Sequence, residues 1–213
     1  PVVAIYSTFL ARAFDQALYD IGLHRRPVIL CVDRAGLTGP DGASHHGVYD
    51  MAMYCRVPGM TIFAPSSVGE IPEMFRTALD LTDGPVAIRW PRGGAHVADE
   101  IGTGMKGRLV REGRDVCVLA AGKMFAAAET ACEILAEEGI DATLWDPRVV
   151  KPLDREMVRH AADHPFVVTV EDGVRVGGFG SQVTDALQRR PAGPFPRVLQ
   201  LGTPDEFLPH GEA

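Results

Sequence analysis

Three side chains of complementary chemistry lie in one loop that follows an apolar, β-branched segment. The segment spans residues 27–33, and the loop after it holds a guanidinium (Arg34), a carboxylate (Asp41) and an imidazole (His45). An arginine can bind a phosphate or carboxylate through two parallel hydrogen bonds, and a histidine can exchange a proton near neutral pH. The loop exceeds the roughly two to six residues usual for α/β connections, which favours ligand binding. A turn at Asp41 with solvated histidines is the alternative on residue types alone.

Two arginines lie at the end of a second strand-like segment, which spans residues 85–90. Ligands collect at the carboxyl ends of parallel strands in α/β sheets, so Arg89 or Arg92 would meet Arg34 there and hold an anion. Side chains alternate along a strand, so one of the two is expected to face the site. Arg92 is favoured because it lies past the strand end, although a surface salt bridge is an alternative for either residue.

An aromatic residue and a cation share one helical face after the first predicted strand. Phe9 and Arg12 are three residues apart, which places them side by side near the start of a helix. Such a pair can grip a flat heteroaromatic ring. An aromatic at helical spacing belongs more often to the core, so the residue types leave both readings open.

The elements that must position these residues alternate between strand-like and helical patterns. Apolar residues at four-residue spacing (Phe9, Ala13, Ala17 and Ile21) predict a helix over residues 8–23. Further helices are expected from Ser66-Ser67 with Pro72 in an early turn, and at 123–138, 153–162 and 181–189. Strands are expected at 2–5, 27–33, 60–64, 85–90, 115–120, 142–145, 166–170 and 197–201. Alternation of this kind predicts an α/β protein with mainly parallel sheets covered by helices.

A glycine-rich segment divides this pattern into two successive domains. Residues 93–107 contain five glycines and few large apolar side chains. We therefore expect a first domain over 1–92, a linker over 93–107 and a second domain over 108–213. The chain starts inside an apparent strand without a methionine, so we expect it to be part of a longer polypeptide, packed against the remainder or another chain.

Composition narrows the classes of function. The 213 residues carry a net charge of −7, which argues against a nucleic-acid partner. No apolar run reaches the roughly 18 residues of a membrane span and no signal sequence is evident, so we expect a cytoplasmic protein. The four cysteines stand singly, which predicts buried free thiols rather than a metal or redox site. His160, His164 and His210 lack metal-ligand spacing and are expected at the surface.

A second glycine-rich stretch, residues 170–181, follows one predicted strand and precedes a helix. A dinucleotide-binding turn fails here, because Gly178-x-Gly180 is followed by Val183 where a third glycine or alanine should stand. A tight strand-to-helix turn is the better interpretation.

Four motifs make the chain recognisable when taken in their order and spacing. They are Tyr6-Ser-Thr-Phe-Leu-Ala-Arg12, Asp33-Arg-Ala-Gly-Leu-Thr-Gly-x-Asp-Gly-x-x-His45, Arg89-x-Pro-Arg-Gly93 and Leu201-Gly-x-Pro-Asp205. Together they resemble the 1-deoxy-D-xylulose-5-phosphate synthase family, thiamine-diphosphate enzymes of the transketolase superfamily, over essentially the whole chain. The Asp-Gly-x-x-His element is shared more widely in the superfamily, whereas the Tyr-Ser-Thr-Phe start and the Asp-Arg-Ala-Gly lead-in indicate this family.

The resemblance implies a fold, an activity and partners. The chain would comprise the latter part of the pyrimidine-binding domain followed by a transketolase C-terminal-like domain. The enzyme would condense pyruvate with glyceraldehyde 3-phosphate to 1-deoxy-D-xylulose 5-phosphate with loss of carbon dioxide, feeding isoprenoid, thiamine and pyridoxal biosynthesis. Thiamine diphosphate supplies the electron sink for this transferase chemistry. By the same resemblance the enzyme would be a homodimer.

The resemblance also assigns roles to individual residues. His45 and Asp41 would be catalytic. The substrate-binding residues would be Tyr6, Arg34 and Arg92, with the two arginines on the phosphate. The cofactor's pyrimidine ring would contact Phe9 and Arg12.

Parts of the family pattern are absent from this sequence. We find neither the Gly-Asp-Gly motif with its downstream Asn, which holds the Mg²⁺ diphosphate, nor a segment carrying the glutamate that activates the aminopyrimidine. We therefore expect no metal ligands in this segment and no activity of the segment alone. The ending at 211–213 also looks short of the family's terminal helix.

Two other classes of function stay open. A transketolase or the β subunit of a 2-oxoacid dehydrogenase would share the fold and the cofactor. A non-catalytic binding or assembly module could retain the fold, but it would have no use for Arg34, Asp41, His45 and Arg92 at one sheet edge.

Overall fold

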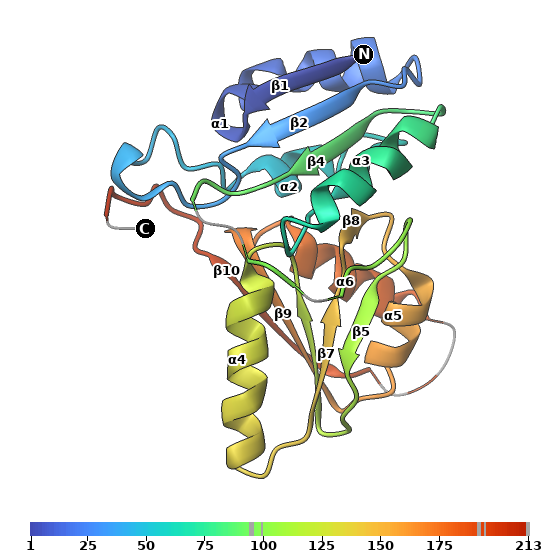
Figure 1. Ribbon diagram of the computed structural model, residues 1–213, viewed down its shortest axis with the longest axis vertical. Coiled ribbons are helices and arrows are strands. Elements are labelled where there is room, and N and C mark those ends of the chain that lie inside the picture. Colours follow the sequence, from blue (N-terminus) through green and yellow to red (C-terminus); the bar gives the residue numbers. More distant parts are fainter. Residues whose placement is uncertain (94–95, 99, 191–192, 194, 212–213) are drawn as a thin grey trace.

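The structure is a computed structural model that describes residues 1–93, 96–98, 100–190, 193 and 195–211. Within this range the chain forms two five-stranded sheets, each with helices on its faces (Figure 1). Residues 94, 95 and 99 of the expected linker, and residues 212–213 of the expected short ending, lie outside the described residues. The predicted α/β architecture with mainly parallel sheets is confirmed.

The first sheet has the strand order β1-β2-β4-β3-β8. Its strands are β1 (Val2–Tyr6), β2 (Ile29–Asp33), β4 (Val86–Arg89), β3 (Thr61–Phe63) and β8 (Val149–Lys151). The first four are parallel, and β8 pairs antiparallel with β3. Because β8 comes from the second half of the chain, the two halves share this sheet, which the sequence pattern did not predict.

Two helices cover opposite faces of the first sheet. From α3 (Glu70–Asp80), Met74 packs against Phe63 and Ile88. On the other face, α2 (Asp50–Tyr54) contributes Tyr54 to a core that continues into the second domain. Apolar burial is therefore continuous between the two domains.

The helix expected over residues 8–23 is irregular. It consists of α1 (Ser7–Leu10), a 3₁₀ turn (Ala11–Ala13) and a π-helix (Gln16–Gly22). The apolar repeat of four residues exceeds the 3.6 residues of an α-turn, and wider π turns fit a longer repeat. Of the predicted face, Ala17 is buried, whereas Phe9 is 39% exposed.

The second sheet has the order β10-β9-β6-β7-β5. Its strands are β10 (Arg197–Thr203), β9 (Phe166–Val174), β6 (Val116–Ala120), β7 (Ala142–Asp146) and the antiparallel edge strand β5 (Arg108–Arg111). One face is covered by α4 (Met124–Glu137), and the other by α5 (Arg155–Ala161) and α6 (Phe179–Gln188). The edge strand β5 falls next to the expected linker and was not predicted.

Three smaller expectations can be compared with the structure. All four cysteines are free and buried, as predicted. The helix predicted from Ser66 begins only at Glu70. The Glu70 carboxylate accepts hydrogen bonds from the amide and the hydroxyl of Ser66, which precedes the helix. The surface position predicted for His164 is wrong: its ring is buried and lies 2.9 Å from the Thr143 hydroxyl. No helix in the described part of the chain has the length and apolar character needed to cross a bilayer.

Candidate functional site

The loop after β2 is closed at its neck by two glycines. The amide of Gly36 donates to the carbonyl of Gly47 at 2.9 Å, and the amide of Gly47 donates back at 2.8 Å. Gly36 has a φ of +79°, and a Cβ on Gly47 would lie 2.3 Å from the carbonyl oxygen of Arg34. Only glycine fits this close backbone approach, so the loop is held as a defined arc at the carboxyl edge of the sheet.

A row of stacked groups begins at the neck of this loop. The guanidinium carbon of Arg34 lies 3.8 Å from the ring centre of Tyr6, and Arg34 also pairs with Asp33 at 2.5 Å. The ring of Phe9 also stacks on Tyr6, with 5.5 Å between ring centres and 9° between planes. Stacking of this kind fixes the orientation of Arg34 and leaves part of Phe9 exposed to a ligand.

His45 and Arg12 extend the same cluster. The His45 ring meets Phe9 edge-on at 5.7 Å, and its Nδ1 lies 2.9 Å from the Ser44 hydroxyl. The guanidinium carbon of Arg12 lies 5.9 Å from the Phe9 ring centre. Five of the residues singled out from the sequence therefore form one contiguous group: Tyr6, Phe9, Arg12, Arg34 and His45.

Arg92 and Asp41 form a second pair at the same loop. Their side chains are 2.6 Å apart, and Arg92 also donates to the carbonyl of Thr38 at 3.2 Å. Arg92 and Arg34 are each paired with a different carboxylate, and Arg92 stays exposed at the rim. A guanidinium with a solvent-facing edge can exchange part of its contact for an incoming anion.

Arg89 is engaged elsewhere, in the protein interior. Its Nε lies 2.7 Å from Asp50 and its Nη1 lies 2.7 Å from Asp172, and all three residues are buried. Burial lowers the pKa of Arg89, but the charges of Asp172 and Asp50 raise it by more than burial lowers it. The pKa of Arg89 therefore lies above its usual value. Of the two arginines considered from the sequence, the structure thus places Arg89 inside and Arg92 at the loop.

His46 differs from its neighbour His45. Its ring is buried, its Nδ1 accepts a hydrogen bond from the Thr38 amide at 3.1 Å, and its Nε2 lies 3.1 Å from the carbonyl of Pro209. Because Nδ1 accepts, the hydrogen is assigned to Nε2, which donates to Pro209. Both ring nitrogens are thereby occupied, whereas His45 keeps its Nε2 free of any protein hydrogen bond within the described residues.

A buried carboxylate lies beneath the glycine-rich turn that precedes α6. Glu171 accepts hydrogen bonds from the amides of Phe179 at 2.9 Å and Gly180 at 2.8 Å. Burial raises the pKa of Glu171 to about 7. A Cβ on Gly178 would lie 2.2 Å from this carboxylate, which explains the glycine. The turn thus wraps the carboxylate of Glu171, a residue within β9 that the sequence pattern did not single out; its position just before the glycine-rich stretch was the available signal.

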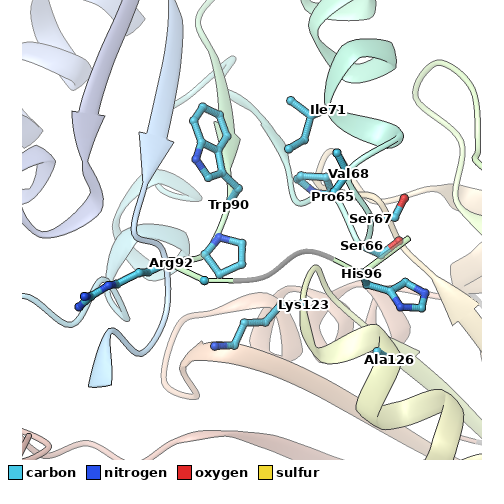
Figure 2. Close-up of a pocket in the computed structure, with 12 residues that line it drawn as sticks. Pro65, Ser66, Ser67, Val68, Ile71, Trp90, Arg92, His96, Lys123 and Ala126 are labelled. Atoms are coloured by element: carbon cyan, nitrogen blue, oxygen red, sulfur yellow. The ribbon is translucent and has the colours of Figure 1, made fainter. Parts of the chain in front are cut away.

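A cleft of about 380 Å³ lies between the two domains beside Trp90. Its walls include Ser66 and Trp90 from the first domain and Lys123 from the start of α4 (Figure 2). Figure 2 shows Arg92 extending away from this cleft, in line with its pairing to Asp41. The lining of the cleft includes Arg92 but none of the five residues of the Tyr6 cluster. Among the residues that the structure describes, no group of three or more His, Cys, Asp or Glu side chains could hold a metal ion.

Family models match nearly the whole chain. Residues 1–96 match the transketolase pyrimidine binding domain, and residues 105–213 match the transketolase C-terminal domain.

Curated relatives are similar over the same length. A 1-deoxy-D-xylulose-5-phosphate synthase from Heliobacterium modesticaldum is 43% identical over 99% of this chain and 33% of its own length. One from Anaeromyxobacter sp. strain K is 49% identical over 100% of this chain and 35% of its own length. The chain thus spans about a third of the length of these relatives.

Solved structures agree in fold. A protein described as a split gene transketolase, inactive beta4 tetramer, superimposes with a TM-score of 0.87 at 32% identity, covering 97% of this chain and 68% of that one. A transketolase from Pichia stipitis superimposes with a TM-score of 0.71 at 17% identity, covering 80% of this chain and 26% of that one.

Proposed function

Because the chain belongs to the transketolase family, we propose that it supplies the substrate-recognition side of a thiamine-diphosphate-dependent 1-deoxy-D-xylulose-5-phosphate synthase. The observation that carries the proposal is the 34–47 loop, where Arg34 stacks on Tyr6 next to the partly exposed Phe9 and where Asp41 pairs with Arg92. Similarity at 43–49% identity to synthases of that name supports the same activity.

In this proposal the phosphate of glyceraldehyde 3-phosphate binds Arg34 and Arg92. Each guanidinium is already oriented, Arg34 by stacking on Tyr6 and Arg92 by its hydrogen bond to the Thr38 carbonyl. Oriented guanidinium groups lose little rotational freedom when a phosphate arrives, which favours bidentate binding. Tyr6 and Asp41 then orient the acceptor, with the Asp41 carboxylate on the side of Arg92.

His45 transfers protons in this proposal. The Ser44 hydroxyl lies at Nδ1, which leaves Nε2 to exchange a proton with the substrate oxygen. An imidazole suits this role because its usual pKa lies near neutral pH. His46 is excluded from it by the occupation of both its ring nitrogens.

The edge of the site around Phe9 suits the pyrimidine ring of the cofactor. Phe9 keeps 39% of its surface exposed, and Arg12 lies beside its ring, so this edge offers a face on which a pyrimidine ring can stack. When bound, thiamine diphosphate would supply the electron sink for decarboxylating pyruvate. In this proposal the remainder of the enzyme holds the diphosphate and Mg²⁺. The complete enzyme is a cytoplasmic homodimer.

The experiment is an assay of the complete enzyme with thiamine diphosphate and Mg²⁺. Pyruvate with glyceraldehyde 3-phosphate should give 1-deoxy-D-xylulose 5-phosphate and one equivalent of carbon dioxide. A ketose phosphate donor in place of pyruvate should give no transfer. Turnover of the ketose donor instead would identify a transketolase, and acyl transfer to a lipoyl acceptor would identify a 2-oxoacid dehydrogenase component.

A further inference from the structure

We propose that His46 is a positioning residue that orients Arg92 through Thr38, and that residues 204–211 of the second domain hold His46 in place. The inference rests on the proposed function, because it assigns a consequence to the same phosphate-binding arginine. It gives the second domain a part in substrate recognition beyond packing. We call residues 204–211 the C-terminal strap.

The inner half of this connection runs from His46 to Arg92. The Nδ1 of His46 lies 3.1 Å from both the amide and the hydroxyl of Thr38, which is fully buried. The carbonyl of Thr38 in turn accepts a hydrogen bond from Arg92 at 3.2 Å. A shift of the Thr38 peptide therefore moves the carbonyl that aims Arg92.

The outer half runs from His46 to the strap. The Nε2 of His46 donates to the carbonyl of Pro209, and the amide of Gly211 donates to the carbonyl of Gly39 at 3.3 Å. Phe207 adds an edge-on contact with the Tyr49 ring, at 6.5 Å between ring centres. Figure 1 shows the strap, in red, reaching the loop after β2, in light blue.

A single ring thus connects segments that are far apart in the sequence. Among the residues that the structure describes, His46 alone forms side-chain hydrogen bonds to both Thr38 and the strap. Without the ring, the buried Thr38 amide loses its acceptor, and an unsatisfied buried donor is costly enough to displace a loop. Displacement of Thr38 removes one of the two contacts that orient Arg92 and leaves only its ion pair with Asp41. The Arg34–Tyr6 stack stays in place, because it belongs to β1 and the loop neck.

The test compares two variants of His46 in the complete enzyme. In His46→Ala both hydrogen bonds are lost. In His46→Asn the side-chain oxygen can take the place of Nδ1 and accept from Thr38, but the amide is too short to reach Pro209. His24→Ala is the matched control and should change nothing, because His24 lies on an exposed turn before β2 and the loop follows the other end of that strand.

We expect His46→Ala to raise the KM for glyceraldehyde 3-phosphate about tenfold while the KM for pyruvate and kcat change less than about twofold. His46→Asn should give an intermediate KM for glyceraldehyde 3-phosphate, because it keeps the contact with Thr38 and loses the contact with the strap. Equal changes in both KM values, or an Asn variant as impaired as the Ala variant, would overturn the proposal. If His46→Ala does not fold, His46→Asn still has to show a rise confined to the phosphorylated substrate.

Hydrogen exchange gives a readout that needs no turnover. Exchange of the peptide covering 204–211 should increase in both variants, and exchange of the peptide covering 34–47 should increase mainly in His46→Ala. Unchanged exchange in the strap would overturn the proposal even if the enzyme is active. A wild-type enzyme without synthase activity would refute the proposed function, whereas the exchange result would still decide whether the strap holds His46.

Discussion

Arg89 at the end of β4 and Asp172 on β9 form a buried ion pair with 2.7 Å between Nη1 and Oδ1. The pair joins the first sheet to the second, and Asp50 holds the other side of the same guanidinium at 2.7 Å. A Cβ on Gly36 would lie 2.2 Å from the Asp172 carboxylate. The second domain therefore contacts the neck of the 34–47 loop directly. Arg89, one of the two arginines at the end of β4, has a structural role.

Removal of Asp172 should destabilise the protein strongly. Asp172→Ala leaves Arg89 buried with one carboxylate, and breaking a buried ion pair typically costs about 3–5 kcal/mol of unfolding free energy. Denaturant unfolding followed by circular dichroism measures this change. The control is Asp185→Ala, which breaks an exposed pair with Arg189 and should cost about 1 kcal/mol or less. Equal small losses in the two variants would contradict the structural role of Asp172.

Glu171 should make stability depend on pH. Burial raises its pKa from 4.5 to about 7, so the folded state binds a proton more tightly than the unfolded state. Its contribution to stability is then fully present below about pH 4.5 and is lost as pH rises to about 7. Glu171→Gln removes this titration, so the unfolding free energy of the variant minus that of the wild type should increase across this window, by up to about 3 kcal/mol. A difference that is constant between pH 4.5 and 8 would contradict the raised pKa.

His45 should control turnover rather than binding. In the complete enzyme, His45→Ala should lower kcat by about 10²–10⁴, the range for losing a general acid–base group. Thiamine diphosphate binding, measured by calorimetry, should stay nearly unchanged, because Phe9 still stacks on Tyr6 without the imidazole. A nearly silent His45→Ala together with a large loss of kcat in His46→Ala would show that the proton-transfer role belongs to the buried ring.

The sequence pattern predicted the regular parts of the fold for physical reasons. Central strands such as β2 and β6 are continuous apolar runs, because both faces of these mainly parallel sheets are covered. The edge strands β5 and β8 escaped prediction because they are three or four residues long and their pairing is antiparallel across the sheet edge. No local pattern indicates that β8 joins the first domain's sheet, because the partner strand is distant in sequence.

Residue types and order indicated which residues form the cluster at the candidate site, but not the contacts that hold its members. The motif spacing brought Tyr6, Phe9 and His45 into one hypothesis. In the structure the Phe9 ring contacts both the Tyr6 ring and the His45 ring. The separate fates of Arg89 and Arg92 depend on carboxylates from other elements, Asp172 above all, and so required the fold. The hydrogen bond of the His46 Nε2 likewise required the fold, because its partner, the Pro209 carbonyl, lies in the other domain.

Phosphate recognition by the 34–47 loop is measured most directly as the preference of the complete enzyme for glyceraldehyde 3-phosphate over glyceraldehyde, expressed as the ratio of kcat/KM values. Arg34→Ala and Arg92→Ala should each lower this ratio about ten- to hundredfold, because a charge-assisted contact contributes about 1.5–3 kcal/mol. The kcat/KM for glyceraldehyde and the KM for pyruvate should change little. A wild-type enzyme with no preference for the phosphorylated aldehyde, or variants that lose both aldehydes equally, would contradict phosphate recognition by this loop.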